Sequence, residues 1–388
     1  MPRTQTPVRL IDAGVVSAIR SQALYHGLAH ARTADSPDTV VLATPGEPYV
    51  CIGYHQNLEH TIDRAFCSQR GLPVVRRETG GGAVYLDSDQ LFVQWIMGPG
   101  RMPLRVDRRF ALFCEVLAAA YRDHAVAASF QPVGDVHVDG RKISGTGAAQ
   151  IGEAEVMTGN LLFDFDTSMM ARIVRSPSTA FAEQVQRSLD AYMTSMRREL
   201  DRLPGREAVA ASYANHAAVA LNAELVPGEL TEIELRSIER WEQQAADPVR
   251  DDPQQGLRRP GVKIHEGVYV VERQLASEGR ELRVTARLAG DRIEEVAVFE
   301  VASRAAADES AGFAAGSAVA SEATDSPSEP GFAALEAALR GLTIEPEPVR
   351  EALEHYNSHN PQPLQVATWS QALLDLRRPQ PSAARQQS

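Results

Sequence analysis

The sequence predicts an α+β protein built from two domains. Its 388 residues exceed the roughly 250–300 that one hydrophobic core usually supports. Short strand-like runs and helical patterns follow one another irregularly along the chain. A polar stretch punctuated by Pro and Gly, residues 246–261, separates a longer first part from a shorter second part. We therefore expect a first domain over residues 1–245, a linker over 246–261 and a second domain over 262–378.

Hydrophobic spacing predicts the elements of the first domain. Residues 10–31 carry apolar side chains at mostly helical spacing, which predicts one amphipathic helix. The remaining expected elements, in chain order, are strands at 39–42 and 49–52, a helix at 63–70, strands at 73–77, 83–86 and 91–97, a helix at 105–121, strands at 133–138, 142–144 and 155–165, and helices at 207–221 and 229–245. Asp139-Gly140 is a favourable two-residue hairpin turn.

The second domain is expected to be smaller and also α+β. Its elements are strands at 268–274, 281–288 and 293–299 and helices at 332–339, 348–355 and 364–376. Residues 302–330 are rich in Ala, Ser, Glu, Asp and Gly, a composition that buries too little apolar surface to offset its ordering entropy. We therefore expect a disordered insertion there and a disordered tail over 379–388.

Composition and charge exclude some classes of function. Fifty-one acidic against thirty-nine basic residues leave a net charge of −12, which weighs against a nucleic-acid partner. No apolar stretch approaches the ~20 residues of a membrane span, and no secretory signal is evident. Three cysteines without metal-type spacing disfavour a disulfide scaffold, so a reduced cytoplasm is expected. Only two of the cations are lysines, Lys142 and Lys263.

A glycine triplet directly after an expected strand is the first chemically informative segment. Gly80, Gly81 and Gly82 allow positive φ or close approach of a ligand, and their amide N–H groups can form an anion-binding concavity. Arg76 and Arg77 precede them and point to opposite strand faces, so one guanidinium could bind a phosphate or carboxylate. Taken alone, the glycine triplet is better explained as a flexible turn beside two solvated arginines.

A lysine in an expected hairpin is the second segment. Lys142 follows the Asp139-Gly140 turn and precedes the small residues Ser144 and Gly145. Its ammonium could act there as a point charge on a carboxylate and a phosphate. The alternative is a solvated hairpin lysine.

A metal site near this lysine is not favoured. Asp135, His137 and Asp139 alternate and would share one strand face, but three ligands on a flat strand rarely close a coordination sphere. No metal ligand set is therefore predicted. Asp135 alone, near a nucleotide and its Mg²⁺, is the better interpretation.

Together and in this order, these segments resemble the signatures of the lipoate–protein ligase A family. The matching residues are 76–85 (RRETGGGAVY) and 139–145 (DGRKISG), supported by 53–57 (GYHQN) and 158–163 (TGNLLF). The resemblance spans roughly residues 8–225, and residues 290–299 and 335–342 resemble the accessory domain of longer ligases. It implies the biotin/lipoate ligase-like fold, similar to class II synthetase cores: a mixed sheet with flanking helices, plus a small α+β accessory domain.

The resemblance also implies an activity. Lipoate would be activated with ATP and Mg²⁺ to lipoyl-AMP and then transferred to a lysine of a lipoyl domain of a 2-oxoacid dehydrogenase E2 subunit or of the glycine-cleavage H protein. Arg77 would contact the nucleotide phosphate, Lys142 would bridge the acyl carbonyl and the α-phosphate, and Asp135 would lie near the approach of the acceptor lysine. The ATP-contacting loop and strand would be Gly80, Gly81, Gly82, Ala83, Val84 and Tyr85.

Three alternatives remain open. An octanoyl- or lipoyl-amidotransferase shares this fold but acts through a cysteine thioester placed shortly before the lysine hairpin, where residues 129–134 (SFQPVG) contain no cysteine. Cys114 is most simply core filler, and Cys51 is a weak candidate nucleophile. A biotin ligase is disfavoured because RRETGGG stands in place of its Gly-Arg-Gly-Arg-type loop. A non-catalytic binder of lipoate or nucleotide would keep the fold without the reaction.

Overall fold

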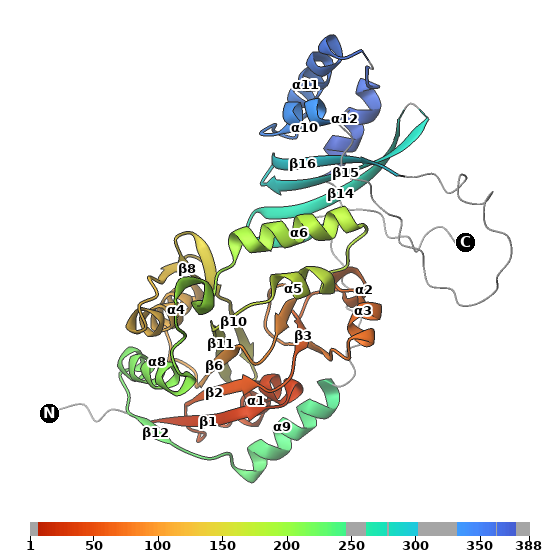
Figure 1. Cartoon of the computed structure of the whole chain (residues 1–388). Coiled ribbons are helices and arrows are strands. Elements are labelled where there is room, and N and C mark those ends of the chain that lie inside the picture. Colours follow the sequence, from red (N-terminus) through yellow and green to blue (C-terminus); the bar gives the residue numbers. More distant parts are fainter. Residues whose placement is uncertain (1–6, 246–260, 278, 302–331, 362, 378–388) are drawn as a thin grey trace, which may run out of the picture. The chain divides into compact units, whose positions relative to one another are not determined.

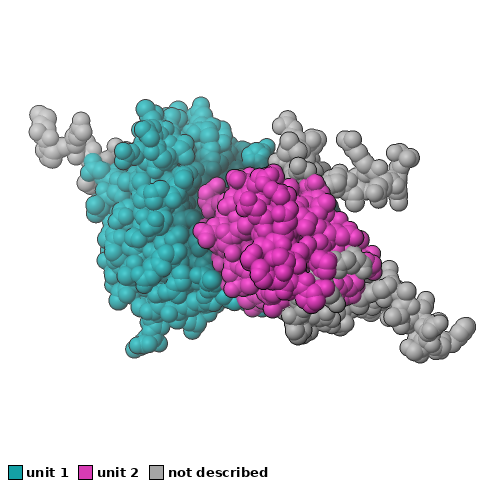
Figure 2. Space-filling model, turned by 90° about the horizontal axis from the view of Figure 1, so that it is seen from above, with its two compact units in different colours: residues 1–175, 189–253 teal, residues 176–188, 254–388 magenta. Residues whose placement is uncertain are grey.

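The computed structural model describes residues 7–245, 261–277, 279–301, 332–361 and 363–377. The chain divides into two compact units (Figure 2), one of residues 1–175 and 189–253 and the other of residues 176–188 and 254–388. The expected linker, insertion and tail fall almost entirely outside the described residues.

A six-stranded mixed sheet forms the centre of the first unit (Figure 1). Its strand order is β10-β11-β6-β2-β1-β12, with β1 parallel to both its neighbours and the other pairs antiparallel. The strands are β1 (Val8–Val16), β2 (Thr39–Pro45), β6 (Gln90–Met97), β10 (Thr146–Ile151), β11 (Ala154–Leu162) and β12 (Leu225–Pro227). Every residue of β2 and β6 is buried, because helices cover both faces of these central strands.

Two pairs of helices cover this sheet and create two cores. Helices α1 (Ala18–Ala31) and α9 (Glu232–Ala245) pack on the face that carries Phe92 and Ile96. Helices α4 (Val106–Asp123) and α8 (Arg206–Leu221) pack on the face that carries Val93 and Trp95. The alternation of these side chains along β6 assigns each to one core.

Two small three-stranded sheets carry the sequence motifs. One has the order β4-β3-β5, with β3 (Tyr49–Ile52), β4 (Val74–Arg76) and β5 (Val84–Leu86). The other has the order β7-β8-β9, with β7 (Ser129–Gln131), β8 (Asp135–Val138) and β9 (Arg141–Ser144). Short helices complete the unit: α2 (Leu58–Thr61), α3 (Arg64–Gln69), α5 (Thr167–Ile173) and α7 (Met196–Glu199).

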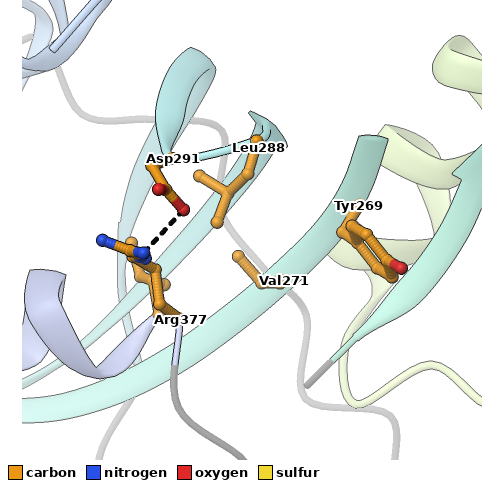
Figure 3. A pocket seen from close by; sticks show the side chains of 7 residues that line it. Tyr269, Val271, Leu288, Asp291 and Arg377 are labelled. Carbon is orange, nitrogen blue, oxygen red and sulfur yellow. Dashed lines mark ion pairs between the residues drawn. The ribbon is translucent and has the colours of Figure 1, made fainter. Parts of the chain in front are cut away.

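The second unit is an antiparallel sheet with helices packed against it. Its strands are β13 (Val262–His265), β14 (Val268–Ser277), β15 (Arg280–Ala289) and β16 (Arg292–Glu300), in that order. Helices α10 (Ala333–Leu339), α11 (Pro346–His359) and α12 (Val366–Asp375) share its core. A small pocket in this unit (Figure 3) is lined by residues that include Tyr269, Val271 and Leu288, and the Asp291–Arg377 ion pair (2.8 Å) lies beside it.

Helix α6 (Thr179–Tyr192) departs from the expected domain boundary. The prediction placed all residues up to 245 in the first domain, whereas residues 176–188 group with the second unit. Ser178 donates a hydrogen bond to Glu272, and Gln184 donates one to Glu295, which ties the start of this helix to the sheet of the second unit.

The expected fold class, a mixed sheet with flanking helices plus a small α+β domain, is correct, as are most of the expected elements. The single helix expected over 10–31 is wrong. Its first part is strand β1, and helix α1 begins only after Ser17, whose side chain accepts a hydrogen bond from Arg20 N–H. Val15, expected on the apolar face, is 73% exposed. Strands β7, β10, β12 and β13 and helices α2, α5, α6 and α7 were not expected.

Candidate active site

The glycine triplet forms a loop whose shape requires glycine at two positions. Gly81 has a φ of +101°, which side chains other than glycine rarely adopt. A Cβ on Gly53 would lie 2.1 Å from the Gly81 carbonyl oxygen, so the end of β3 and the loop touch through bare backbone. The hydrogen bonds Arg77 N–H to Ile52 O (3.0 Å) and Tyr54 N–H to Thr79 O (3.1 Å) fix this contact. The three glycines are exposed to solvent.

The two arginines before the loop point in different directions. Arg77 folds into the loop, where Nη2 donates to the carbonyls of Gly80 and Gly82, each at 2.8 Å, and Nη1 donates to Cys51 O (3.3 Å). Arg76 donates to the backbone carbonyl of Gln56 (2.6 Å). Among the described residues, no carboxylate forms an ion pair with Arg77, so its charge rests on neutral dipoles. Arg77 is therefore the guanidinium that an anion at the loop would meet.

A buried histidine that the sequence analysis did not single out anchors the loop. His26 Nε2 accepts the Glu78 N–H (2.9 Å), and Nδ1 donates to Gln22 O (2.8 Å), so the imidazole is neutral in this arrangement. Its ring stacks on Trp241 with 4.0 Å between centroids. Burial lowers the pKa of His26 to about 3. Because His26 precedes Glu78 by 52 residues, no local pattern could have revealed the contact.

Tyr85 and its neighbours continue from the loop into β5. Ala83 and Val84 are partly buried, whereas the Tyr85 side chain is only 7% exposed. Burial and the nearby Asp87 raise the pKa of Tyr85 to about 12. The Tyr85 ring therefore belongs to the interior, and its backbone is the part that could reach a nucleotide.

The lysine hairpin adopts the expected turn. Asp139 and Gly140 both have positive φ, +48° and +79°, as a type I′ turn requires. Lys142 Nζ lies 2.6 Å from Asp135 Oδ1, and its side chain is 23% exposed. Tyr192 donates to Asp135 Oδ2 (3.3 Å) and lies 3.4 Å from His137 Nε2. A partly buried, paired lysine excludes the alternative of a solvated hairpin lysine.

The structure brings the two motifs together. A Cβ on Gly147, at the start of β10, would lie 3.2 Å from Thr79 Oγ1 in the glycine loop. Lys142 and Gly147 are five residues apart on adjacent strands of the chain. The glycine loop therefore lies against the chain segment that directly follows the lysine hairpin.

The residues weighed as metal ligands do not form a cluster. His137 Nε2 lies 3.9 Å from Asp135 Oδ2, but Asp135 is already paired with Lys142. Asp139 lies in the hairpin turn. In the part of the chain that the structure describes, no three His, Cys, Asp or Glu side chains are arranged to hold a metal ion.

All three cysteines are buried. Burial raises the pKa of Cys67 to about 11, that of Cys114 to about 12, and that of Cys51 despite the nearby Arg77. Cys114 lies in the core of α4, as the sequence predicted. Cys67, in the short helix α3, is 1% exposed. None of these thiols is poised as a thiolate nucleophile.

The glycine loop and the paired lysine both lie within a segment that matches the catalytic domain of one enzyme family. Residues 18–218 match the family model described as the lipoyl protein ligase A/B catalytic domain. The chain belongs to this family.

Relatives include both transferases and ligases. The octanoyltransferase LipM of Kyrpidia tusciae is 27% identical over 258 residues, which cover 60% of this chain and 93% of that protein. The lipoate-protein ligase LplJ of Bacillus subtilis is 32% identical over 130 residues, which cover 34% of this chain and 38% of that protein.

Solved structures show the same fold. A bipartite lipoate protein ligase from Thermoplasma acidophilum aligns with a TM-score of 0.58 and 18% identity, covering 64% of this chain and 99% of that one. A lipoate-protein ligase A bound with ATP aligns with a TM-score of 0.53 and 18% identity, and the alignment covers 61% of this chain and 95% of that one. No described helix is long and apolar enough to cross a membrane.

Proposed function

We propose that this chain is an ATP-dependent lipoate–protein ligase. It forms lipoyl-AMP from lipoate and ATP and passes the lipoyl group to a lysine of a lipoyl domain or of a glycine-cleavage H protein. The observation that carries the proposal is the pairing of an exposed glycine loop around Arg77 with the neighbouring, carboxylate-paired Lys142. The second unit would be the accessory domain of the longer ligases.

Adenylate formation brings two anions together. A carboxylate oxygen of lipoate attacks the α-phosphorus of ATP, the bond to the bridging oxygen breaks, and pyrophosphate leaves. Arg77 turns from the loop carbonyls toward the phosphates, and Lys142 exchanges Asp135 for the carboxylate and α-phosphate. Both cations then stabilise charge that grows in the transition state. Mg²⁺ would arrive on the phosphates, since the described residues supply no metal cage of their own.

Transfer to the acceptor requires little more than positioning. The amine of the acceptor lysine attacks the acyl carbonyl, AMP leaves, and the amine gives up a proton. Asp135, freed from Lys142, is a carboxylate beside that lysine which could accept this proton. Holding amine and carbonyl in line supplies most of the rate.

An octanoyl- or lipoyl-amidotransferase is the second candidate, because the LipM relative is covered almost completely. That chemistry needs a reactive thiol. The three cysteines of the chain are buried with raised pKa values, and Ser129, exposed in β7, begins the stretch where the transferase nucleophile is expected. These observations favour the ligase.

ATP–pyrophosphate exchange tests the proposal. Exchange that depends on lipoate and Mg²⁺ is the expected result for the ligase. Transfer of octanoate from an octanoyl thioester without ATP, in the absence of exchange, would instead identify the transferase. Lipoate or nucleotide binding without either reaction would identify a binding protein.

A further inference from the structure

A line of carboxamide hydrogen bonds joins the two motifs through the interior. Gln90 Nε2 donates to the Tyr85 carbonyl (3.2 Å), and Gln90 Oε1 accepts from Asn160 Nδ2 (2.7 Å). Asn160 Oδ1 in turn accepts the Gly145 N–H (3.0 Å). Tyr85 ends the glycine motif and Gly145 ends the lysine motif, so this relay of Gln90 and Asn160 links their backbones.

The relay is buried and has a fixed direction. Gln90 is 1% exposed and Asn160 is 9% exposed, so a lost partner is not replaced cheaply by water. If the side-chain amide of Gln90 or Asn160 rotated by 180°, its N–H₂ and C=O groups would exchange places. Two donors or two acceptors would then face each other. The relay therefore has one hydrogen-bonded orientation of its two carboxamides.

The relay ends close to the ammonium. The Lys142 Cε atom would lie 3.9 Å from a Cβ placed on Gly145, so the lysine side chain passes over the residue that Asn160 holds. Ser144 Oγ also donates to the Asn160 carbonyl, which fixes the same end of β9 a second time. A shift of Gly145 would thus alter the contact that the Lys142 side chain makes next to its ammonium.

We propose that Gln90 and Asn160 are positioning residues that set Lys142 against the glycine loop for adenylate formation. This rests on the proposed ligase function. The relay touches no substrate; it holds the two cation-bearing segments at one separation. A misplacement of about 1 Å in a reacting group costs on the order of 10² in rate, so the relay bears on kcat more than on ATP binding.

Steady-state ATP–pyrophosphate exchange by the full chain tests the relay. Gln90→Met removes both hydrogen bonds of the Gln90 side chain and keeps a similar side-chain length. It is expected to lower kcat by roughly 10–100-fold, with the KM for ATP within about threefold. Asn160→Asp keeps the size and the acceptor for Gly145 but removes the donor to Gln90, and the same loss is expected. The double variant should be no slower than the worse single variant, because a broken relay cannot break twice.

Gln94→Met is the matched control. Gln94 is also 1% exposed and lies on the same face of β6, but it donates to Ser21 O (2.8 Å) in helix α1. Gln94→Met removes one hydrogen bond together with a buried side-chain oxygen that has no partner among the described residues, so it should lower the melting temperature no more than Gln90→Met does, while kcat stays within twofold. Circular dichroism melts confirm that each variant is folded at the assay temperature.

Three outcomes would each refute the positioning role of Gln90 and Asn160. The first is that the folded Gln90→Met and Asn160→Asp variants keep kcat within twofold of the natural chain. The others are an equal kcat loss in Gln94→Met and a multiplicative kcat loss in the double variant. If the natural chain transfers octanoate from a thioester and shows no exchange, the ligase proposal fails. The kcat values of the same variants, measured in the transfer reaction, then test the positioning role of Gln90 and Asn160. Activity in neither reaction overturns both.

Discussion

The glycine loop and the lysine hairpin hold their cations in opposite ways. Arg77 rests on the carbonyl dipoles of its own loop, whereas Lys142 rests on the full charge of Asp135. The loop depends on backbone shape, and the hairpin depends on side-chain partners. A change in the loop should therefore act through conformation, and a change in the hairpin should act through charge.

Lys142→Ala gives the largest expected effect and isolates charge. Exchange should fall by at least about 10³-fold, because the only ammonium of the first unit's described residues is lost from the transition state. The melting temperature should change little. Lys263→Ala, which removes the other lysine of the chain, is the control and should leave exchange unchanged. A normal single-turnover rate in Lys142→Ala would remove this residue from the mechanism.

Gly53→Ala isolates conformation. Its Cβ would overlap the Gly81 carbonyl oxygen, so the loop must move, and exchange should fall by roughly 10²-fold. Unfolding free energy, measured in urea, should drop by about 1–3 kcal/mol. Gly80→Ala is the control for stability, since a Cβ there meets nothing within 4 Å. Equal urea midpoints for the two variants would contradict the close approach.

The pH dependence of stability tests the histidine beneath the loop. Native His26 stays neutral down to a pKa of about 3, while the unfolded chain takes up a proton near its ordinary value of 6.5. Stability due to His26 is thus complete above pH 6.5 and is lost as the pH falls toward 3, by about 2 kcal/mol at pH 5.

His26→Gln should flatten that pH dependence, because its amide oxygen can still accept the Glu78 N–H but does not titrate. Urea unfolding at pH 7.5 and pH 5 measures the slope for both chains. An identical slope in the variant would show that His26 is not the titrating group.

Cysteine replacement gives the smallest expected effect and applies to both segments. The Cys51 thiol accepts a hydrogen bond from Arg77 of the glycine loop, and the Cys114 thiol lies near Asp135 and Lys142 of the hairpin. Cys51→Ser and Cys114→Ser should each leave the rate of lipoyl transfer within about twofold, since neither thiol reacts in the ligase, although stability falls slightly. A mass shift of the acceptor domain measures the transfer. Loss of transfer in one of the folded variants would support a thioester mechanism.

Features that depend on neighbouring residues could be predicted from the sequence. The glycine loop and the Asp139-Gly140 turn require particular backbone angles, and those angles select glycine, asparagine or aspartate directly. The type and order of most strands and helices followed from the spacing of apolar side chains. The joint action of the two motifs stays a prediction, and in the structure Gly147, two residues after the lysine motif, lies against Thr79 of the glycine motif.

Features that depend on distant partners could not be predicted. His26 meets Glu78 and Gln90 meets Asn160 across 52 and 70 residues, and no local pattern marks either contact. The wrong prediction of one helix over residues 10–31 also arose because a distant partner decides the structure. Strand β1 is specified by its parallel neighbours β2 and β12, the second of which lies more than 200 residues away, and this pairing overrides an apparently helical spacing.

The course of helix α6 affects any attempt to dissect the chain. Ser178, directly before the helix, donates a hydrogen bond to Glu272, and Gln184 within it donates one to Glu295. Its last residue, Tyr192, donates one to Asp135 beside Lys142. A fragment that stops at residue 245 would keep the helix but lose the acidic partners of Ser178 and Gln184. Weak activity in such a fragment could therefore reflect the loss of these two hydrogen bonds at helix α6, and it would not place catalysis in the second unit.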